Sequence, residues 1–276
     1  MKRNKGQGQG RSGKDTDFIM ALADHLSYLH LPTIRGVYEQ EAQRARAESY
    51  AYEQYLHNVV ECEVQARSQH RIARLLDQSR LPLGKTLEMF DVHRLPKRIT
   101  LQLPTINEGT FADRKENLLV FGNPGSGKTH LVCAIGHELI RRSRTVLFTP
   151  ASHLIQELLR AKRDLKLESA LKRLRKYEPL IIDDIGYLQH DRDEMEVLFA
   201  LLADRYERAS IVLTSNLPFS KWETIFKDPM TTAAAIDRLV HHCIIFELNV
   251  RSYRLEHAHQ QAQGPKGGEL KKKATI

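Results

Sequence analysis

The chain contains 276 residues, of which 42 are Lys or Arg and 34 are Asp or Glu, so its formal net charge is +8. Hydrophobic residues make up 41% and charged residues 28%, which excludes a wholly disordered chain, and the length predicts one or two domains. No apolar run approaches the roughly 18 residues of a membrane helix, the N-terminus lacks a secretory signal, and the cysteines have neither disulfide nor metal-ligand spacing. We therefore expect a cytoplasmic protein without a structural metal.

The excess positive charge lies at the two ends of the chain. Residues 1–14 carry five basic residues and no acid, and residues 264–276 carry four basic residues and one acid. These contributions of +5 and +3 account for the whole net charge of +8. Both ends are rich in Gly and Lys, which is typical of disordered tails. We interpret them first as solubilising ends, and second as arms that contact nucleic-acid phosphates.

A small all-α domain is predicted over residues 15–82. A polar cap opens a helix whose apolar residues recur at intervals of three and four until Pro32 ends it. A longer helical pattern covers about residues 33–79, with a break near Ser49. Residues 81–115 contain three prolines and are predicted to form a connector.

From residue 117 onward, short β-rich runs alternate with helical patterns. Four of the five runs are continuously apolar, as expected for strands buried on both faces. Right-handed crossovers between them would give a parallel sheet covered by helices on both sides, so the predicted fold class is α/β. We place this domain at residues 83–255 and a basic tail at residues 256–276. The five strands are predicted at residues 117–121, 145–148, 180–183, 211–214 and 243–246.

A phosphate-binding motif follows the first predicted strand. Residues 122–129 read GNPGSGKT, which fits G-x-x-x-x-G-K-[ST], and a helical pattern follows directly. In such a loop, successive backbone N–H groups converge on phosphate oxygens, with help from the helix N-terminus. We expect Lys128 to reach the β- and γ-phosphates of ATP, and the Thr129 hydroxyl to bind Mg²⁺. The predicted nucleotide-binding residues here are Gly122, Asn123, Pro124, Gly125, Ser126, Gly127, Lys128, Thr129 and His130.

Polar residues follow two other predicted strands. The run LIIDD ends in Asp183 and Asp184, at the edge where open α/β sheets bind ligands. Asp183 is predicted to hold Mg²⁺ and Asp184 to orient the attacking water. Asn216 follows the run LTS and is predicted to bind the γ-phosphate or that water. Without the phosphate-binding motif, the acids would be interpreted as an exposed turn and Asn216 as a loop start.

The ordered set of motifs resembles a known family. The segments GNPGSGKTHL, LIIDDIGYL, ERASIVLTSNLPFSKW, AAAIDRLVHH and SYRL, with KTLEMFD at residues 85–91, are similar to the AAA+ ATPases of the IstB-like group. These are helper proteins encoded beside an integrase-type transposase in insertion sequences. The similarity spans roughly residues 15–255, and helicase loaders of the DnaC type share several of the motifs. The resemblance implies an AAA+ P-loop ATPase with a five-stranded parallel sheet.

The resemblance also implies roles for single residues. Arg238 matches the arginine finger that such ATPases insert into a neighbouring subunit's site, and Arg254 matches a sensor-2-like arginine that touches the γ-phosphate. Phe90 lies where the family's sequence flanks the adenine. The alternatives are a surface salt bridge for each arginine and a core position for Phe90. Most AAA+ proteins have Asp-Glu where this chain has Asp183-Asp184, so slow hydrolysis is a hypothesis.

A basic helical insert, residues 153–177, lies between the second and third predicted strands. Related initiator-type ATPases place an insert here facing the bore of their assembly, so we expect this one to contact the DNA backbone without reading sequence. The alternative is a solvated helix face. The candidate DNA-binding residues are Arg160, Lys162, Arg163, Lys166, Lys172, Arg173 and Arg175, with Lys176 beside them.

The expected function is an ATP-dependent assembly on double-stranded DNA that recruits and stimulates a transposase. The alternative is a replicative helicase loader on single-stranded DNA, for which aromatic residues should be interleaved with the basic ones. Residues 153–177 contain only Tyr177, which disfavours that alternative. A metabolite kinase and a nucleotide-binding protein that never hydrolyses ATP are the remaining hypotheses.

Overall fold

The structure is a computed structural model that describes residues 13–187, 192–222, 229–250 and 252–253. The chain divides into two compact units, residues 1–73 and 74–276, which are described separately. The C-terminal basic tail, Arg254 and residues 1–12 of the predicted N-terminal tail lie outside the described residues, whereas Gly13 and Lys14 of that tail begin a helix. Within the described ranges, no helix combines the length and the apolar composition needed to cross a bilayer.

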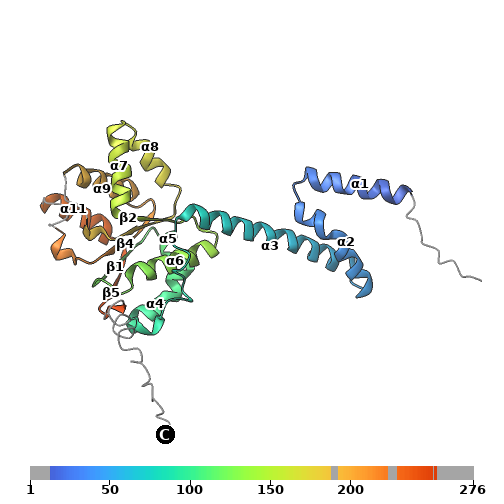
Figure 1. Ribbon diagram of the computed structural model, residues 1–276, viewed down its shortest axis with the longest axis horizontal. Coiled ribbons are helices and arrows are strands. Elements are labelled where there is room, and N and C mark those ends of the chain that lie inside the picture. Colours follow the sequence, from blue (N-terminus) through green and yellow to red (C-terminus); the bar gives the residue numbers. More distant parts are fainter. Residues whose placement is uncertain (1–12, 188–191, 223–228, 251, 254–276) are drawn as a thin grey trace, which may run out of the picture. The chain divides into compact units, whose positions relative to one another are not determined.

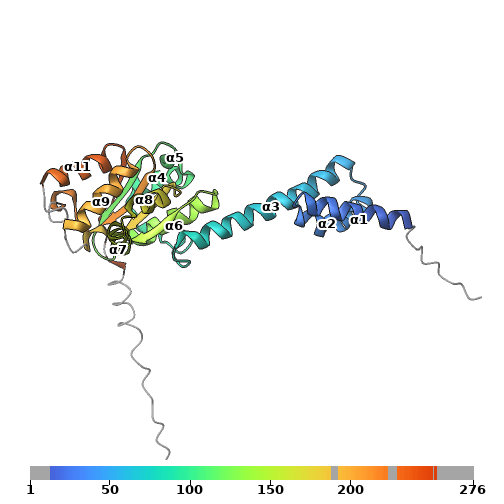
Figure 2. The same ribbon diagram turned by 90° about the horizontal axis from the view of Figure 1, so that it is seen from above.

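The first unit consists of helices. Helix α1 (Gly13–Tyr28) is followed by α2 (Pro32–Ala47), and α3 (Tyr52–Ser79) begins in this unit. Residues 48–51 separate α2 from α3, which confirms the break predicted near Ser49. The buried carboxylate of Glu63 on α3 accepts hydrogen bonds from the backbone N–H groups of Thr33 (2.8 Å) and Ile34 (3.1 Å), which open α2. A carboxylate at a helix N-terminus satisfies free N–H groups there and so attaches α2 to α3 (Figure 2).

The second unit is built on a five-stranded parallel sheet with the order β2-β3-β4-β1-β5. This confirms the α/β fold class and all five predicted strands. In chain order the strands are β1 (Asn117–Gly122), β2 (Leu147–Pro150), β3 (Pro179–Asp183), β4 (Ser210–Ser215) and β5 (Cys243–Leu248). Because all are parallel, their carboxyl ends meet at one edge, and β4 separates the strand that leads into the phosphate-binding loop from the strand that ends in Asp183.

Helices cover both faces of the sheet (Figure 1). One face carries α7 (Ala151–Arg163), α8 (Leu167–Leu174), α9 (Arg192–Arg205) and α11 (Pro229–Val240), whose apolar residues form the main core with the strands. The other face carries α6 (Lys128–Arg141) and α4 (Lys97–Glu108). Short elements complete the unit: the helix α5 (Thr110–Asp113) and the 3-10 turns η1 (Val92–Arg94), η2 (Ile185–Tyr187) and η3 (Phe219–Lys221).

One sequence-based expectation about helices was wrong. The connector predicted over residues 81–115 contains α4, which buries Ile99, Leu103 and Ile106 at helical spacing even though Pro104 lies inside it. The burial of this apolar face offsets the backbone hydrogen bond that Pro104 removes. The insert is helical as predicted, and it consists of two helices, α7 and α8, joined by a turn at residues 164–166.

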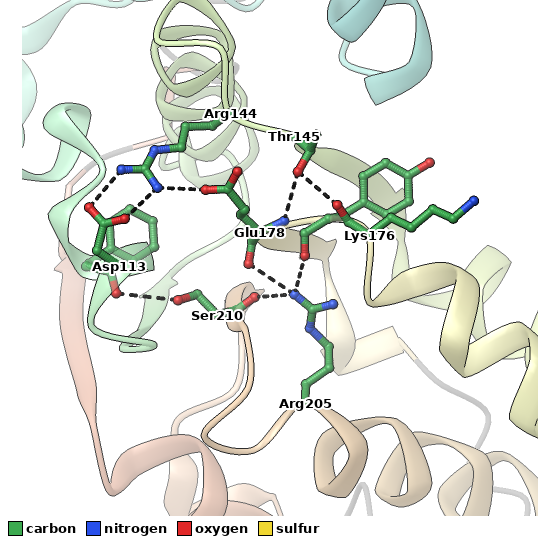
Figure 3. A network of polar contacts seen from close by, with 9 residues as sticks. Asp113, Arg144, Thr145, Lys176, Glu178, Arg205 and Ser210 are labelled. Atoms are coloured by element: carbon green, nitrogen blue, oxygen red, sulfur yellow. Dashed lines mark hydrogen bonds and ion pairs between the residues drawn. The ribbon is translucent and has the colours of Figure 1, made fainter.

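A polar network holds the amino-terminal edge of the sheet (Figure 3). The buried Arg205 of α9 donates to the carbonyl oxygens of Leu174 (2.9 Å), Tyr177 (2.9 Å) and Ser210 (2.8 Å). Burial lowers the pKa of this guanidinium to about 10, so at neutral pH it stays charged. These bonds attach the end of α8 to the starts of β3 and β4, because carbonyl oxygens compensate the buried charge.

Candidate nucleotide-binding site

The phosphate-binding loop connects β1 to α6. Gly125 and Gly127 have φ angles of +80° and +95°, which are accessible to glycine without strain. The buried Lys128 donates to the carbonyl oxygens of Gly122 (2.8 Å) and Asn123 (3.1 Å), so its ammonium group lies against the loop. Residues 122–129 therefore form the turn that the motif predicts, with the start of α6 directly behind it.

The side chains of Thr129, Asp183 and Thr214 are connected by hydrogen bonds beside the loop. The Thr129 hydroxyl lies 3.0 Å from both carboxylate oxygens of Asp183, and the Thr214 hydroxyl donates to Asp183 Oδ1 at 2.7 Å. The hydroxyl of Thr129 and the carboxylate of Asp183 are hard oxygen donors, the ligand chemistry that Mg²⁺ prefers. Sequence reasoning chose Thr129 and Asp183 but missed Thr214, whose position at the end of a buried strand was the available signal.

Asp184 and Asn216 lie at the same pocket as the loop. Asp184 has a φ of +66°, and its backbone N–H donates to the Thr214 hydroxyl at 2.8 Å. Asn216 Oδ1 is buried without a hydrogen-bond partner among the described residues. A Cβ atom on Gly186 would lie 2.0 Å from that oxygen, so the absence of a side chain at residue 186 leaves room for the amide. A buried amide oxygen without a partner is costly unless a ligand or water satisfies it.

The pocket has a volume of about 350 Å³, and its far wall comes from the segment before α4. The Phe90 ring lies 3.2 Å from a Cβ position on Gly127 and meets the His130 ring edge to face at 5.1 Å. Phe90 and His130 thus give the pocket an aromatic wall next to the loop, where the resemblance places the adenine. Asp183, Gly122 and Asn123 lie behind the pocket lining rather than in it.

The chain segment after β5 also contacts the loop. The backbone N–H of Tyr253 donates to the Gly125 carbonyl at 3.0 Å, and the Arg94 guanidinium lies 5.1 Å from the centre of the Tyr253 ring. Both side chains line the pocket. Sequence reasoning chose Arg254, which lies outside the described residues, and missed Arg94 and Tyr253; the charge of Arg94 close to Phe90 in sequence was the only signal.

Arg238 lies apart from this pocket, at the opposite edge of the sheet. The side-chain amide of Asn117, the first residue of β1, donates to the Leu239 carbonyl at 3.0 Å. The phosphate-binding loop begins at the other end of β1, about 16 Å away at the usual rise of a strand. The Arg238 guanidinium stacks on Phe199 at 4.6 Å and lines a second pocket of about 230 Å³ with Arg114 and Lys115.

The basic residues of the insert divide into two groups. Lys162 is paired with Asp193 (2.9 Å) and Glu196 (2.8 Å), Arg173 with Glu157 (3.2 Å), and Arg175 with Asp204. No ion pair within the described part of the chain involves the second group, which is exposed and consists of Arg160, Arg163, Lys166, Lys172 and Lys176.

In the sheet, β4 lies between β1, which leads into the phosphate-binding loop, and β3, which ends in Asp183. This strand order places the chain among the AAA+ class of P-loop ATPases. A sequence model of the family described as IstB-like ATP binding protein matches residues 24–261. The chain therefore belongs to the IstB-like family of ATP-binding proteins, as its motifs suggested.

Relatives and solved structures agree with this membership. The insertion sequence ATP-binding protein y4iQ/y4nD/y4sD of Sinorhizobium fredii is 45% identical over 230 residues, which cover 83% of this chain and 77% of that protein. The insertion sequence IS5376 ATP-binding protein of Geobacillus stearothermophilus is 38% identical, covering 89% of this chain and 98% of that protein. The crystal structure of the DnaC helicase loader shares the fold, with a TM-score of 0.51 at 17% identity over 61% of this chain and 98% of that one.

Proposed function

We propose that this ATPase assembles on double-stranded DNA in an ATP-dependent manner and recruits and stimulates the transposase of an insertion sequence. The observation that carries the proposal is the position of Arg238, at the opposite end of β1 from the nucleotide pocket of its own chain. The names of the two relatives, both insertion sequence ATP-binding proteins, support the link to transposition. The proposal places the protein in the cytoplasm, with the chromosomal DNA.

ATP hydrolysis in the pocket follows from the side chains around it. Thr129 and Asp183 would hold Mg²⁺, which when bound neutralises charge on the β- and γ-phosphates. Lys128 binds the same phosphates, and Asp184 orients the attacking water. The unpartnered amide oxygen of Asn216 positions that water beside the γ-phosphate. Phe90 and His130 contact the adenine.

Arg238 acts on the neighbouring subunit. Its guanidinium lies on the Phe199 ring, at a pocket that is also lined by Lys115 and by Arg114, which is paired with Glu116 at 2.8 Å. Arg238 and Lys115 therefore present positive charge to an incoming triphosphate. An arginine supplied in trans typically raises hydrolysis by about 10³–10⁵ through stabilisation of transition-state charge. ATP would thus bridge two subunits, and its hydrolysis would time their separation.

The first unit provides a second contact for self-association. Its helix α3 exposes Tyr52, Leu56, Val60 and Val64, with 91%, 61%, 44% and 56% of their surface accessible. These residues are spaced by four, so they form one apolar stripe along the helix. Exposed apolar patches mark interaction sites on soluble proteins, and we propose a second copy of the unit as the occupant of this one.

DNA contact is proposed for the exposed basic residues of the insert that remain outside ion pairs. Arg160, Arg163 and Lys166 surround the turn between α7 and α8, and positive side chains in such a place bind phosphates through counterion release. Lys162, Arg173 and Arg175 are already neutralised by acids within the chain. We assign them to holding the insert in place.

Sedimentation of the full chain with duplex DNA tests the proposal. With a non-hydrolysable ATP analogue, the wild type should form a large complex on duplex DNA, and Arg238→Ala should not, although it still binds the analogue. Arg208→Ala, which removes a 65% exposed arginine in the turn after α9, is the matched control and should assemble normally. A wild type that stays monomeric with both ligands would contradict the proposal.

The same experiment with single-stranded DNA addresses the helicase-loader alternative, which the shared fold with the DnaC loader favours. Assembly on single strands in preference to duplex would support that alternative. We expect the reverse, because the exposed basic residues around the insert turn are not interleaved with aromatic rings that could stack on bases.

A further inference from the structure

The turn between α7 and α8 has an unusual residue at its centre. Helix α7 ends in a paired hydrogen-bond pattern: the Lys166 N–H donates to the Ala161 carbonyl at 2.7 Å, and the Leu165 N–H to the Lys162 carbonyl at 3.1 Å. This pattern places Leu165 in the left-handed region, with a φ of +57°. Glycine is the usual residue there, because a Cβ atom is strained in that conformation.

Leu165 is also the most exposed large apolar side chain among those described, with 94% of its surface accessible. Seven other non-glycine residues in the described ranges have a left-handed φ, and all of them are polar or charged. A glycine or asparagine would relieve the strain at residue 165 and remove the exposed apolar surface. The stability of the folded chain therefore does not explain why residue 165 is a leucine.

The residues around Leu165 are mostly basic, with Asp164 and Glu168 as the nearby acids, and the turn is firmly held. Arg160, Arg163 and Lys166 are exposed, and their side chains form no ion pair within the described part of the chain. The two helices that carry the turn are anchored below it by buried leucines, among them Leu158 and Leu171. Arg205 binds the far end of α8 through the Leu174 carbonyl. The turn is thus connected to the sheet through buried contacts, which would hold it in place when a bound duplex pushes against it.

We propose that Leu165 is an apolar wedge that enters the minor groove of duplex DNA while Arg160, Arg163 and Lys166 bind the flanking phosphates. Such a side chain, pressed between two base pairs, partly unstacks them and bends the duplex toward the major groove. The inference rests on the proposed DNA-bound assembly and adds the residue that deforms the DNA.

The wedge also implies where on DNA the protein acts. Unstacking costs least at pyrimidine–purine steps such as TA and CA, because these steps are the most flexible. The assembly should therefore favour duplexes with these steps at the position of the insert, although Leu165 forms no hydrogen bond with a base. The preference for these steps arises from the lower cost of deforming the duplex there, and not from hydrogen bonds to the bases.

The test compares bending with binding, for the full chain with a non-hydrolysable ATP analogue. Donor and acceptor dyes on the ends of a short duplex report the bend, and anisotropy reports affinity. We expect Leu165→Ala and Leu165→Gly to lose most of the bend signal and the preference for TA steps, while affinity falls less than about tenfold. Leu165→Met should behave as the wild type, because it keeps an apolar side chain.

Controls separate this inference from the function on which it rests. Leu101→Ala removes another exposed leucine, on α4, and should leave the bend unchanged. Leu165→Gly should raise the melting temperature by about 2–4 °C, because the strain is relieved, so a loss of bending cannot be due to unfolding. If Leu165→Ala bends the duplex as the wild type does, the wedge is contradicted while DNA binding stands. If the wild type binds no duplex, both proposals fail.

Discussion

The hydroxyl of Thr214 donates a hydrogen bond of 2.7 Å to Asp183 Oδ1 and accepts one of 2.8 Å from the backbone N–H of Asp184. One side chain at the end of β4 therefore orients both acids at the end of β3. Because Thr129 contacts the same carboxylate at 3.0 Å, the phosphate-binding loop, β3 and β4 share one polar cluster. A change in one of these three segments therefore alters the hydrogen bonds of the other two.

Replacement of Thr214 by Val removes both hydrogen bonds with little change in shape. A hydrogen bond to a charged group contributes about 1.5–3 kcal/mol, so we expect the ATPase kcat to fall about 10- to 100-fold while nucleotide affinity changes little. Thr214→Ser should restore activity, since it restores the hydroxyl. Thr149→Val is the control, because the hydroxyl of that buried threonine of β2 donates to the carbonyl of the next residue at 3.2 Å and contacts neither acid. Equal losses in the two valine variants would contradict this role.

Substitution of Asp184 tests whether this residue activates the attacking water. Asp184→Asn should leave ATP binding intact and lower the steady-state hydrolysis rate at least 10²-fold, because the amide cannot accept the proton. Asp184→Glu should raise the rate if the short side chain makes the natural enzyme slow. An ATPase rate unchanged by Asp184→Asn would remove Asp184 from the mechanism.

Gly186 should be required for the position of Asn216. A Cβ atom there would lie 2.0 Å from Asn216 Oδ1, so Gly186→Ala must displace the amide. We predict a fall in kcat with KM for ATP nearly unchanged, measured by steady-state kinetics. Gly84→Ala, at a glycine with open space around it, provides the comparison and should have wild-type kinetics. Wild-type kinetics in Gly186→Ala would show that Asn216 is not needed in this position.

The folding stability of the first unit should fall at acidic pH because of Glu63. Burial opposes ionisation of its carboxyl, but hydrogen bonds from Arg67, Ile34 and Thr33 outweigh it and lower the pKa below its ordinary value of 4.5. A lowered pKa stabilises the fold above the unfolded pKa, and the contribution is lost as pH falls through the folded pKa. Glu63→Gln should therefore lower the melting temperature at pH 7 and have a smaller effect near pH 3. An equal effect at both pH values would contradict this assignment.

The five strands and the phosphate-binding loop were predictable because each depends on neighbouring residues. Continuous apolar runs predict buried parallel strands, and GNPGSGKT is a local motif whose geometry follows from its glycines. The placement of Asp184 and Asn216 at one pocket followed from the parallel sheet, since parallel strands end at one edge.

The unpredicted features depend on contacts between distant segments. Helix α4 was missed because Pro104 outweighed the apolar spacing of Ile99 and Leu103, whose burial appears only when α6 covers them. The sequence also did not indicate which basic residues of the insert are neutralised, because their partners Asp193 and Asp204 lie about 30 residues away in sequence. The left-handed conformation of Leu165 gave no sequence signal, since leucine is disfavoured there.

Mixing two inactive variants shows whether Arg238 completes the active site of a neighbouring subunit. Lys128→Ala lacks a working nucleotide site but retains Arg238, whereas Arg238→Ala has the reverse defect. With duplex DNA present, the mixture should regain a substantial fraction of wild-type ATP hydrolysis, because mixed assemblies contain intact sites between unlike subunits. If the mixture hydrolyses ATP no faster than the sum of the separate variants, although Arg238→Ala still binds ATP, Arg238 does not act in trans.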